Sequence, residues 1–208
     1  KTILSLNKLG VYQDLKKFLT PILMIRIRDP KKLSDLAKID LPENYYSISR
    51  EKFFSVLYKR IAIKNSITIK NTEVVSLHQN ENTVDCISKE SKFFQAKVLI
   101  GADGFDGITR KAVLGSTIKP QTYKVIRRCV IPSNDALKSM SDRSISLWMG
   151  NGWHLVTYPI SHGHLINNVL VSNQLIPNFK EYKNPFIHLM DNLNWFESPL
   201  FKNNLASV

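Results

Sequence analysis

The stretch Lys97-Val-Leu-Ile-Gly-Ala-Asp-Gly-Phe-Asp-Gly-Ile-Thr-Arg-Lys111 decides the fold that this sequence predicts. It opens on an apolar run, residues 98 to 100, which is typical of a strand buried on both faces. Glycines follow at positions 101, 104 and 107, and their missing Cβ atoms let main-chain N–H groups approach a ligand. A helical composition then runs from Ile108 to Gly115, a suitable residue to follow a helix. The stretch predicts a strand, a glycine turn and a helix.

A strand-to-helix turn of this kind is a general site for nucleotides and phosphates. The helix N-terminus offers unpaired N–H groups and a partial positive charge. The spacing Gly101-x-x-Gly104-x-x-Gly107 is neither the G-x-G-x-x-G of dinucleotide-binding folds nor a Walker loop. An acidic ribose ligand about twenty residues further on is also missing. The turn alone therefore does not name its ligand.

Two segments resemble signatures of the flavin-dependent aromatic hydroxylases. Residues 103 to 110 resemble D-G-x-x-S-x-x-R, with Gly107 in place of the serine, as in the p-hydroxybenzoate hydroxylase variant D-G-F-x-G-I-S-R. Tyr46-x-Ile48-x-Arg50-x-x-Phe53 resembles the family's I-x-R-x-x-L element, in which the arginine contacts the flavin. The alternative for residues 103 to 110 is an ordinary turn of an α/β protein. The alternative for Arg50 is a solvated arginine on the surface.

A third segment resembles salicylate hydroxylase-like members of the same family. Residues 147 to 159, Leu-Trp-Met-Gly-Asn-Gly-Trp-His-Leu-Val-Thr-Tyr-Pro, match L-W-x-G-x-x-x-H-x-V-x-Y-P. The resemblance makes Trp148 and His154 candidate substrate-binding residues. The alternatives are a tryptophan that shapes the core or a cavity, and a strand histidine that is hydrogen-bonded within the sheet. The catalytic base cannot be assigned.

The resemblance implies a mixed α/β fold with a partial Rossmann-like FAD-binding domain, including a β-meander, over residues 1–118. A substrate domain built on an antiparallel sheet is expected over residues 119–208. Periodicity predicts helices at residues 2–9, 12–18, 50–62, 135–140 and 185–193. Ser49 is expected to cap the third helix, with Phe53, Phe54, Leu57 and Ile61 on its buried face. Strands are expected at 21–28, 45–48, 66–70, 73–77, 83–88, 93–94, 97–100, 123–131, 144–150, 153–160 and 165–172, and a loop at 29–43.

Composition excludes several other classes of function. The formal charge is +12, but the basic residues are scattered singly or in pairs, so a nucleic-acid stripe is not predicted. An apolar span of about twenty residues is missing, so a transmembrane helix is not expected. Cys86 and Cys129 are expected to be reduced thiols. His162-x-His164 has metal-ligand spacing without a third ligand near in sequence, so a metal site is not predicted.

By resemblance, the whole enzyme uses NAD(P)H to reduce FAD, and O2 to hydroxylate a small aromatic or quinol-type substrate. FAD would be held by Arg50, by main-chain groups near Val75 and by Asp103 and Gly104. Arg110 would contact the nicotinamide nucleotide. The enzyme is expected to be cytoplasmic, or membrane-peripheral if the substrate is a quinol precursor.

The family's G-x-G-x-x-G unit and its G-D motif are expected to lie before Lys1 and after Val208. We therefore expect a fragment that is inactive and binds flavin poorly alone. Two other functions stay open from the sequence. One is a different flavoprotein of the same fold, such as an epoxidase or a reductase, and the other is a truncated, non-catalytic binding module.

Overall fold

The computed structural model describes residues 2–32, 34–104, 106–115, 121–134, 142–173, 177–182 and 184–202. Contacts divide the chain into two compact units. We call Lys1–Lys64 with Thr122–Val208 the sheet unit, and Asn65–Gln121 the small unit. The elements confirm the predicted mixed α/β class. The division into an FAD-binding part over residues 1–118 and a substrate part over 119–208 is functional and stays a prediction.

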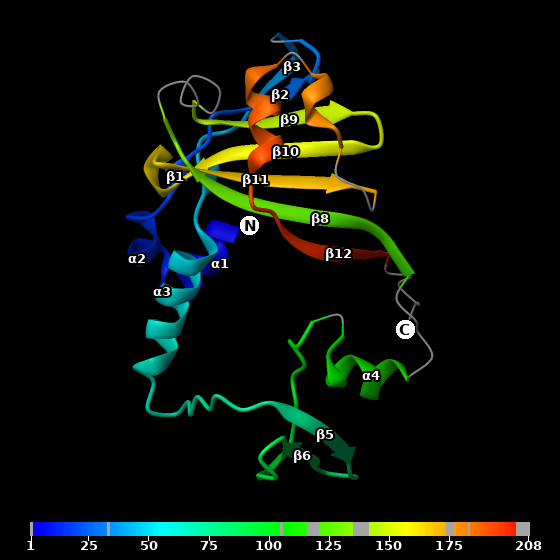
Figure 1. Ribbon diagram of the computed structural model, residues 1–208. Helices are drawn as coiled ribbons and strands as arrows, with labels where there is room; N and C mark the ends of the chain where they lie inside the picture. Colours follow the sequence, from blue (N-terminus) through cyan, green and yellow to red (C-terminus); the bar gives the residue numbers. More distant parts are fainter. Residues whose placement is uncertain are drawn as a thin grey trace. The chain divides into compact units, whose positions relative to one another are not determined.

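A seven-stranded sheet organises the sheet unit (Figure 1), with the strand order β12-β8-β11-β10-β9-β2-β3. The pair β2–β9 is parallel, whereas β8 to β11 form an antiparallel run. The bounds are β2 Met24–Arg28, β3 Asp35–Asp40, β8 Gln121–Pro132, β9 Ser144–Gly150, β10 Trp153–Ile160, β11 Leu165–Ser172 and β12 Phe196–Lys202. The predicted loop at 29–43 is wrong, because β3 lies within it and pairs with β2. Pairing between strands, rather than local propensity, makes this segment a strand.

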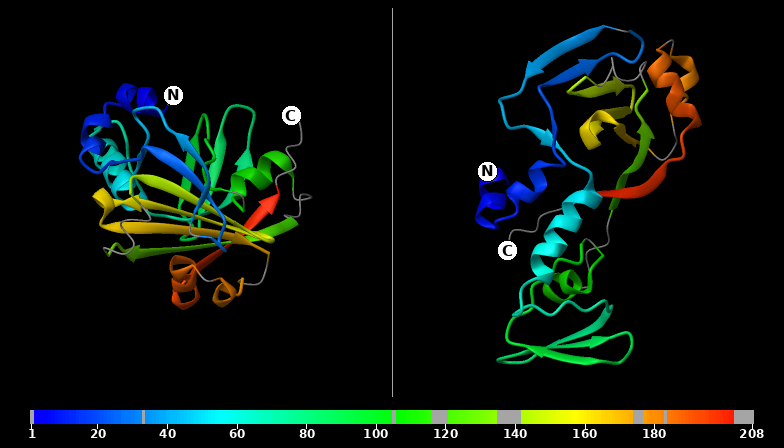
Figure 2. Two further views of the ribbon diagram at one scale, coloured as in Figure 1. Left: turned by 90° about the horizontal axis from the view of Figure 1, so that it is seen from above. Right: turned by 90° about the vertical axis from the view of Figure 1, so that its left-hand side faces the viewer.

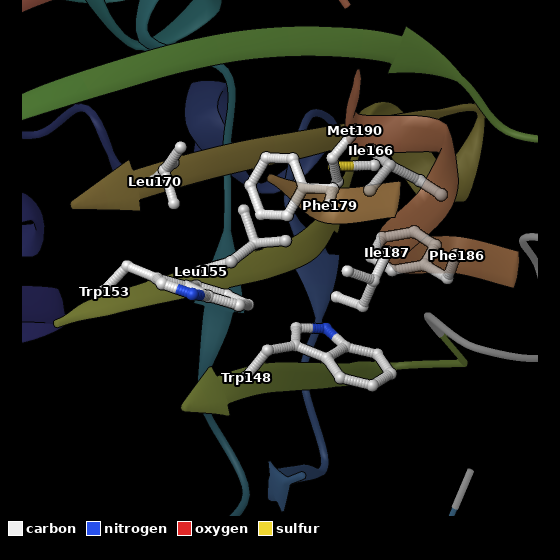
Figure 3. Packing of buried hydrophobic residues seen from close by; sticks show 9 residues of the cluster. All are labelled: Trp148, Trp153, Leu155, Ile166, Leu170, Phe179, Phe186, Ile187 and Met190. Atoms are coloured by element: carbon white, nitrogen blue, oxygen red, sulfur yellow. The ribbon is translucent and has the colours of Figure 1, made fainter. Parts of the chain in front are cut away.

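One face of the sheet, here called the covered face, carries the hydrophobic core. The left view of Figure 2 shows the helical segment in orange against this face. This segment comprises η2 (Phe179–Glu181), α6 (Pro185–Leu189) and η3 (Met190–Asn192), so the predicted helix 185–193 is split. Figure 3 shows the cluster that they form with the strands: Trp148, Trp153, Leu155, Ile166, Leu170, Phe179, Phe186, Ile187 and Met190. Trp148 stacks on Phe186 with ring centroids 5.5 Å apart.

The opposite face of β8 to β11, here called the open face, is mostly half-buried or exposed. Side chains alternate along a strand, so the register defines its members. They are Ile145, Leu147 and Met149 of β9, His154, Val156 and Tyr158 of β10, Asn167, Val169 and Val171 of β11, and Lys124, Ile126, Arg128 and Val130 of β8. The face is thus apolar with a few polar and cationic groups.

Three helices and a two-stranded ribbon complete the sheet unit. They are α1 (Thr2–Lys8), α2 (Tyr12–Lys16) and α3 (Arg50–Ala62), with β1 (Thr20–Pro21) paired to β4 (Tyr46–Ser47). Ser49 caps α3 as predicted, accepting a hydrogen bond from the Lys52 N–H at 3.3 Å. The predicted buried face of α3 is partly wrong, because Phe54 and Ile61 are 63% and 40% exposed. Val56 is buried instead, since it faces α2 along the i, i+3, i+4 stripe that begins at Phe53.

The small unit contains a three-stranded antiparallel meander and one helix. Its elements are β5 (Val74–Gln79), β6 (Val84–Ser88), β7 (Phe93–Ala96) and α4 (Ile108–Leu114). The meander is confirmed, but the predicted strands at 66–70 and 97–100 are wrong. Val98 and Ile100 are 73% and 85% exposed rather than buried. A buried strand needs hydrogen-bonded neighbours, and within the described small unit no strand pairs with this run.

The predicted helix at 135–140 falls outside the described residues. Among the helices that are described, none is long and apolar enough to cross a membrane.

Candidate cofactor and substrate sites

The glycine turn of the small unit is built around the Asp103 carboxylate. One of its oxygens accepts the Thr109 N–H at 3.0 Å, and the other bonds to the Thr109 hydroxyl. Asp103 thereby occupies the start of α4, where donors would otherwise lack partners. A Cβ at Gly107 would lie 2.2 Å from the Asp103 Cγ. Glycine stands at this position because the carboxylate fills the space of a side chain.

The electrostatics of the turn follow from the same contacts. The Thr109 hydroxyl, followed by the Thr109 N–H, lowers the pKa of Asp103 below its ordinary value. Both bonds favour the ionised carboxylate, as does its place beside a helix N-terminus. Asp103 therefore carries a negative charge in neutral solution.

The other two glycines of the turn differ in their surroundings. A Cβ at Gly101 would lie 2.1 Å from the Thr109 Oγ1, so the absence of a side chain makes room for the threonine. Gly104 has φ +81°, a conformation that favours glycine, and its missing Cβ points into open space. Main-chain atoms at Gly104 are therefore accessible to a ligand.

An open cleft of about 890 Å³ lies over this turn. Asp103, Gly104 and Arg110 line it together, along with Leu77 and Gln79 of β5. A carboxylate can accept hydrogen bonds from ribose hydroxyls, and Asp103 and Gly104 thus fit the sugar-phosphate part of a dinucleotide such as FAD. Arg110 can bind the phosphates of a second nucleotide bidentately.

The structure brings three of the five predicted cofactor residues to one cleft. Val75 lies on β5 with 50% of its surface exposed and is not among the residues that line the cleft. Arg50 is the first residue of α3 in the sheet unit, where it is exposed. Contacts of all five residues with a cofactor stay predictions.

The open face of the sheet unit presents a second candidate site. His154 and Tyr158 point to the same side of β10, and Tyr158 is the register partner of Asn167 on β11. Burial, followed by the charge of Lys124, lowers the pKa of His154. Burial raises the pKa of Tyr158, against the opposite effect of Arg128. A neutral imidazole and a neutral phenol therefore lie among apolar side chains with two cations nearby.

The two predicted substrate residues do not share a face. Trp148 is on the covered face, 1% exposed between Phe186 and the Arg28 guanidinium. This geometry supports the alternative in which Trp148 shapes the core, and does not support direct substrate contact. Tyr158 was not among the predicted substrate residues, although its spacing of four from His154 in a strand was the available signal.

The comparisons with known proteins define the class. The chain has the fold of FAD-dependent hydroxylases. It aligns with the Klebsiella pneumoniae protein HpxO complexed with FAD and uric acid at a TM-score of 0.77 and 16% identity, covering 96% of this chain and 56% of that one. It aligns with 2,6-dihydroxypyridine-3-hydroxylase from Arthrobacter nicotinovorans at a TM-score of 0.70 and 20% identity, covering 85% and 45%.

Sequence relatives agree with this class, which confirms the predicted resemblance to FAD-dependent aromatic-ring monooxygenases. The chain is 29% identical to 3-hydroxybenzoate 6-hydroxylase 1 of Aquipseudomonas alcaligenes over 130 residues, 62% of this chain and 33% of that protein. It is 29% identical to 6-methylsalicylate 1-monooxygenase of Aspergillus terreus over 151 residues, 66% and 33%. These matches span about a third of each relative's length. No family profile matches the chain.

Proposed function

We propose that the protein containing this chain is a flavin-dependent monooxygenase that hydroxylates a small aromatic acid, using FAD, NAD(P)H and O2. The observation that carries the proposal is the cleft at the start of α4, where Asp103, Gly104 and Arg110 meet. When bound, FAD supplies the redox chemistry, and the protein supplies position, exclusion of water and charge. We place the protein in the cytoplasm.

The cofactor roles proposed for these residues follow from their chemistry. Gly104 offers accessible main-chain groups, and the ionised Asp103 is suited to accept hydrogen bonds from sugar hydroxyls. Arg50 is proposed to bind the flavin diphosphate, and Arg110 the nicotinamide nucleotide. A charge-assisted hydrogen bond contributes about 1.5–3 kcal/mol, so the loss of either arginine should weaken binding by roughly ten- to a hundredfold.

The open face supports an aromatic acid as the substrate. Val156, Val169 and Ile126 provide apolar contact for a ring. Arg128 and Lys124, on the same face, are suited to neutralise a carboxylate. His154 and Tyr158 are proposed to form hydrogen bonds with a ring hydroxyl, since each places a polar side-chain group on a face that is otherwise mostly apolar. The names 3-hydroxybenzoate and 6-methylsalicylate in the relatives are consistent with such a substrate.

The proposal is tested on the purified protein that contains this chain. We expect flavin absorbance that survives gel filtration, NAD(P)H oxidation stimulated by 3-hydroxybenzoate, and a product heavier by one oxygen atom. Oxidation of NAD(P)H without an oxygenated product would indicate a reductase. Lack of bound flavin would indicate a non-catalytic module.

Variants with matched controls separate the proposed roles. Arg50→Gln should lower the flavin content, whereas Lys52→Gln, in the same helical turn, should not. Arg110→Gln should raise KM for NAD(P)H at unchanged flavin content, with Lys111→Gln as its control. Equal effects of an arginine variant and its lysine control would contradict the corresponding role.

The substrate face is tested in the same way. Tyr158→Phe should raise KM for the aromatic acid by about fivefold or more, because a hydrogen bond contributes roughly 1 kcal/mol. Its control is Tyr182→Phe, since the Tyr182 hydroxyl accepts a hydrogen bond from the Trp153 indole at 3.2 Å on the covered side. An unchanged KM in Tyr158→Phe would remove this residue from the proposed site.

A further inference from the structure

A second hollow lies in the sheet unit, at the hairpin between β10 and β11. We call it the hairpin hollow. It has a volume of about 390 Å³ and is lined by Arg143, His162 and His164, with Thr20, Pro21 and Asp142 among its other walls. Thr20 and Pro21 form β1, and Asp142 and Arg143 directly precede β9. His162 lies in the turn η1 (Ser161–Gly163), and His164 directly follows it. The function proposed above makes no use of them.

The walls of the hairpin hollow are held by hydrogen bonds between distant segments. The His162 N–H donates to the Thr20 hydroxyl at 2.8 Å. The His162 Nε2 lies 2.9 Å from the carbonyl of Lys17, so this nitrogen carries a proton and donates. The Arg143 carbonyl accepts the Leu23 N–H at 2.7 Å. The turn and the start of β9 are therefore both fixed to the segment around β1.

The backbone around the hollow is strained. Arg143, Ser161 and His162 have φ values of 42°, 52° and 58°, in the left-handed region that side chains other than glycine rarely adopt. Such residues persist only where the surrounding structure holds them, and they are concentrated at ligand sites. Two of these three strained residues, Arg143 and His162, line the hollow itself.

Two charged groups line the hollow, the Arg143 guanidinium and the Asp142 carboxylate. Among the described residues, neither the Arg143 guanidinium nor the His164 ring makes a hydrogen bond or an ion pair. The Asp142 carboxylate likewise makes no ion pair with its neighbour Arg143. The Arg143 guanidinium and the His164 ring can together offer several donors to a tetrahedral oxyanion, whereas the donors of His162 are already bonded to Thr20 and Lys17.

We infer that the hairpin hollow binds the phosphate group of a phosphate monoester. Arg143 provides the bidentate contact, and His164 provides a further donor. The volume exceeds that of a phosphate ion, and Pro21 and Pro159 give apolar walls for the organic part of the ester. The site lies in the sheet unit, whereas the cleft at α4 belongs to the small unit.

The test is a titration followed by ¹⁵N amide NMR, with inorganic phosphate and phenyl phosphate as probes. We expect shifts confined to the amides of residues 20, 143 and 161–164, and at least tenfold tighter binding of phenyl phosphate than of phosphate. Arg143→Gln should weaken binding by tenfold or more while its amide spectrum stays folded. Lys17→Gln is the matched control, because the Lys17 ammonium lies over the Phe18 ring, 5.3 Å from its centroid. It should leave binding unchanged.

Three results would overturn the inference. They are shifts spread over basic residues throughout the chain, equal weakening by Lys17→Gln and Arg143→Gln, and binding of phenyl phosphate that is no tighter than that of phosphate. Competition by NADPH but not by NADH would indicate that the phosphate group bound in the hollow is the 2′-phosphate of a nucleotide. Binding of phenyl phosphate without such competition would support a separate phosphorylated metabolite.

Discussion

The substitution Asp35→Asn should destabilise the sheet unit more than its place at the start of an edge strand suggests. The Asp35 carboxylate lies 3.1 Å from the Arg28 Nε, 3.6 Å from the Arg26 Nη1 and 3.4 Å from the Lys38 Nζ. The Arg28 side chain is only 5% exposed, and its guanidinium lies 4.9 Å from the centroid of the Trp148 ring. Asparagine keeps the size of the side chain but removes the negative charge that these cations share.

The magnitude follows from burial. Removal of one partner of a buried ion pair costs about 3–5 kcal/mol, because the remaining charge stays desolvated. Asp35 retains 12% exposure and Lys38 retains 58%, so we take the lower end, about 3 kcal/mol. With a urea dependence on the order of 2 kcal/mol per molar, the unfolding midpoint should fall by about 1.5 M.

Tryptophan fluorescence is the suitable assay, because Trp148, Trp153 and Trp195 all belong to the sheet unit. Asp40→Asn, at the exposed end of the same strand, is the control and should shift stability by less than about 0.5 kcal/mol. Adding Arg28→Met to Asp35→Asn should cost less than the sum of the single changes, since no buried cation is then left unpaired. Equal midpoints for Asp35→Asn and Asp40→Asn would refute the reasoning.

Three further predictions concern the turn and the core. Thr109→Val should raise the pKa of Asp103 towards its ordinary value, which a carboxyl NMR titration measures. Because the pKa of Asp103 is lowered in the folded state, its hydrogen bonds to Thr109 stabilise the fold above about pH 4, and this stabilisation is lost as the pH falls through the folded-state pKa. Gly104→Ala should destabilise the turn by about 1–2 kcal/mol because of its φ of +81°, seen as faster amide exchange in α4; unchanged exchange would contradict this. Leu155→Ala should lower the free energy of unfolding by about 2–5 kcal/mol, since Leu155 is 0% exposed; a urea midpoint within error of the wild type would argue against its place in the core.

Local signals in the sequence predicted local structure well. Ser49 and the residues after it placed α3 with the observed bounds, and Gly115 follows α4 with the expected positive φ of 75°. These features depend on contacts within a few residues, so the sequence pattern contains their cause.

The remaining elements could not be predicted from the sequence, because they depend on pairing between strands that are distant in the chain. The run Val98 to Ile100 has the composition of a buried strand, yet composition does not say whether neighbouring strands are present. Residues 35 to 40 form β3 only because β2 lies beside them. In the candidate sites, the motif located Asp103, but its contact with Thr109 depends on the folded turn. The opposite faces of Trp148 and His154 follow from strand alternation once β9 and β10 are paired.

The parallel pair β2–β9 has a consequence for biosynthesis. Met24 pairs with Ser144, so the first strand of the large sheet leaves the ribosome long before the partner that completes its hydrogen bonds. The meander and α4 are contiguous in the chain and can form in the interval, because their contacts close short loops. Until β9 is synthesised, one edge of β2 is exposed to other nascent chains, and association at this edge is the misfolding hazard that the topology creates.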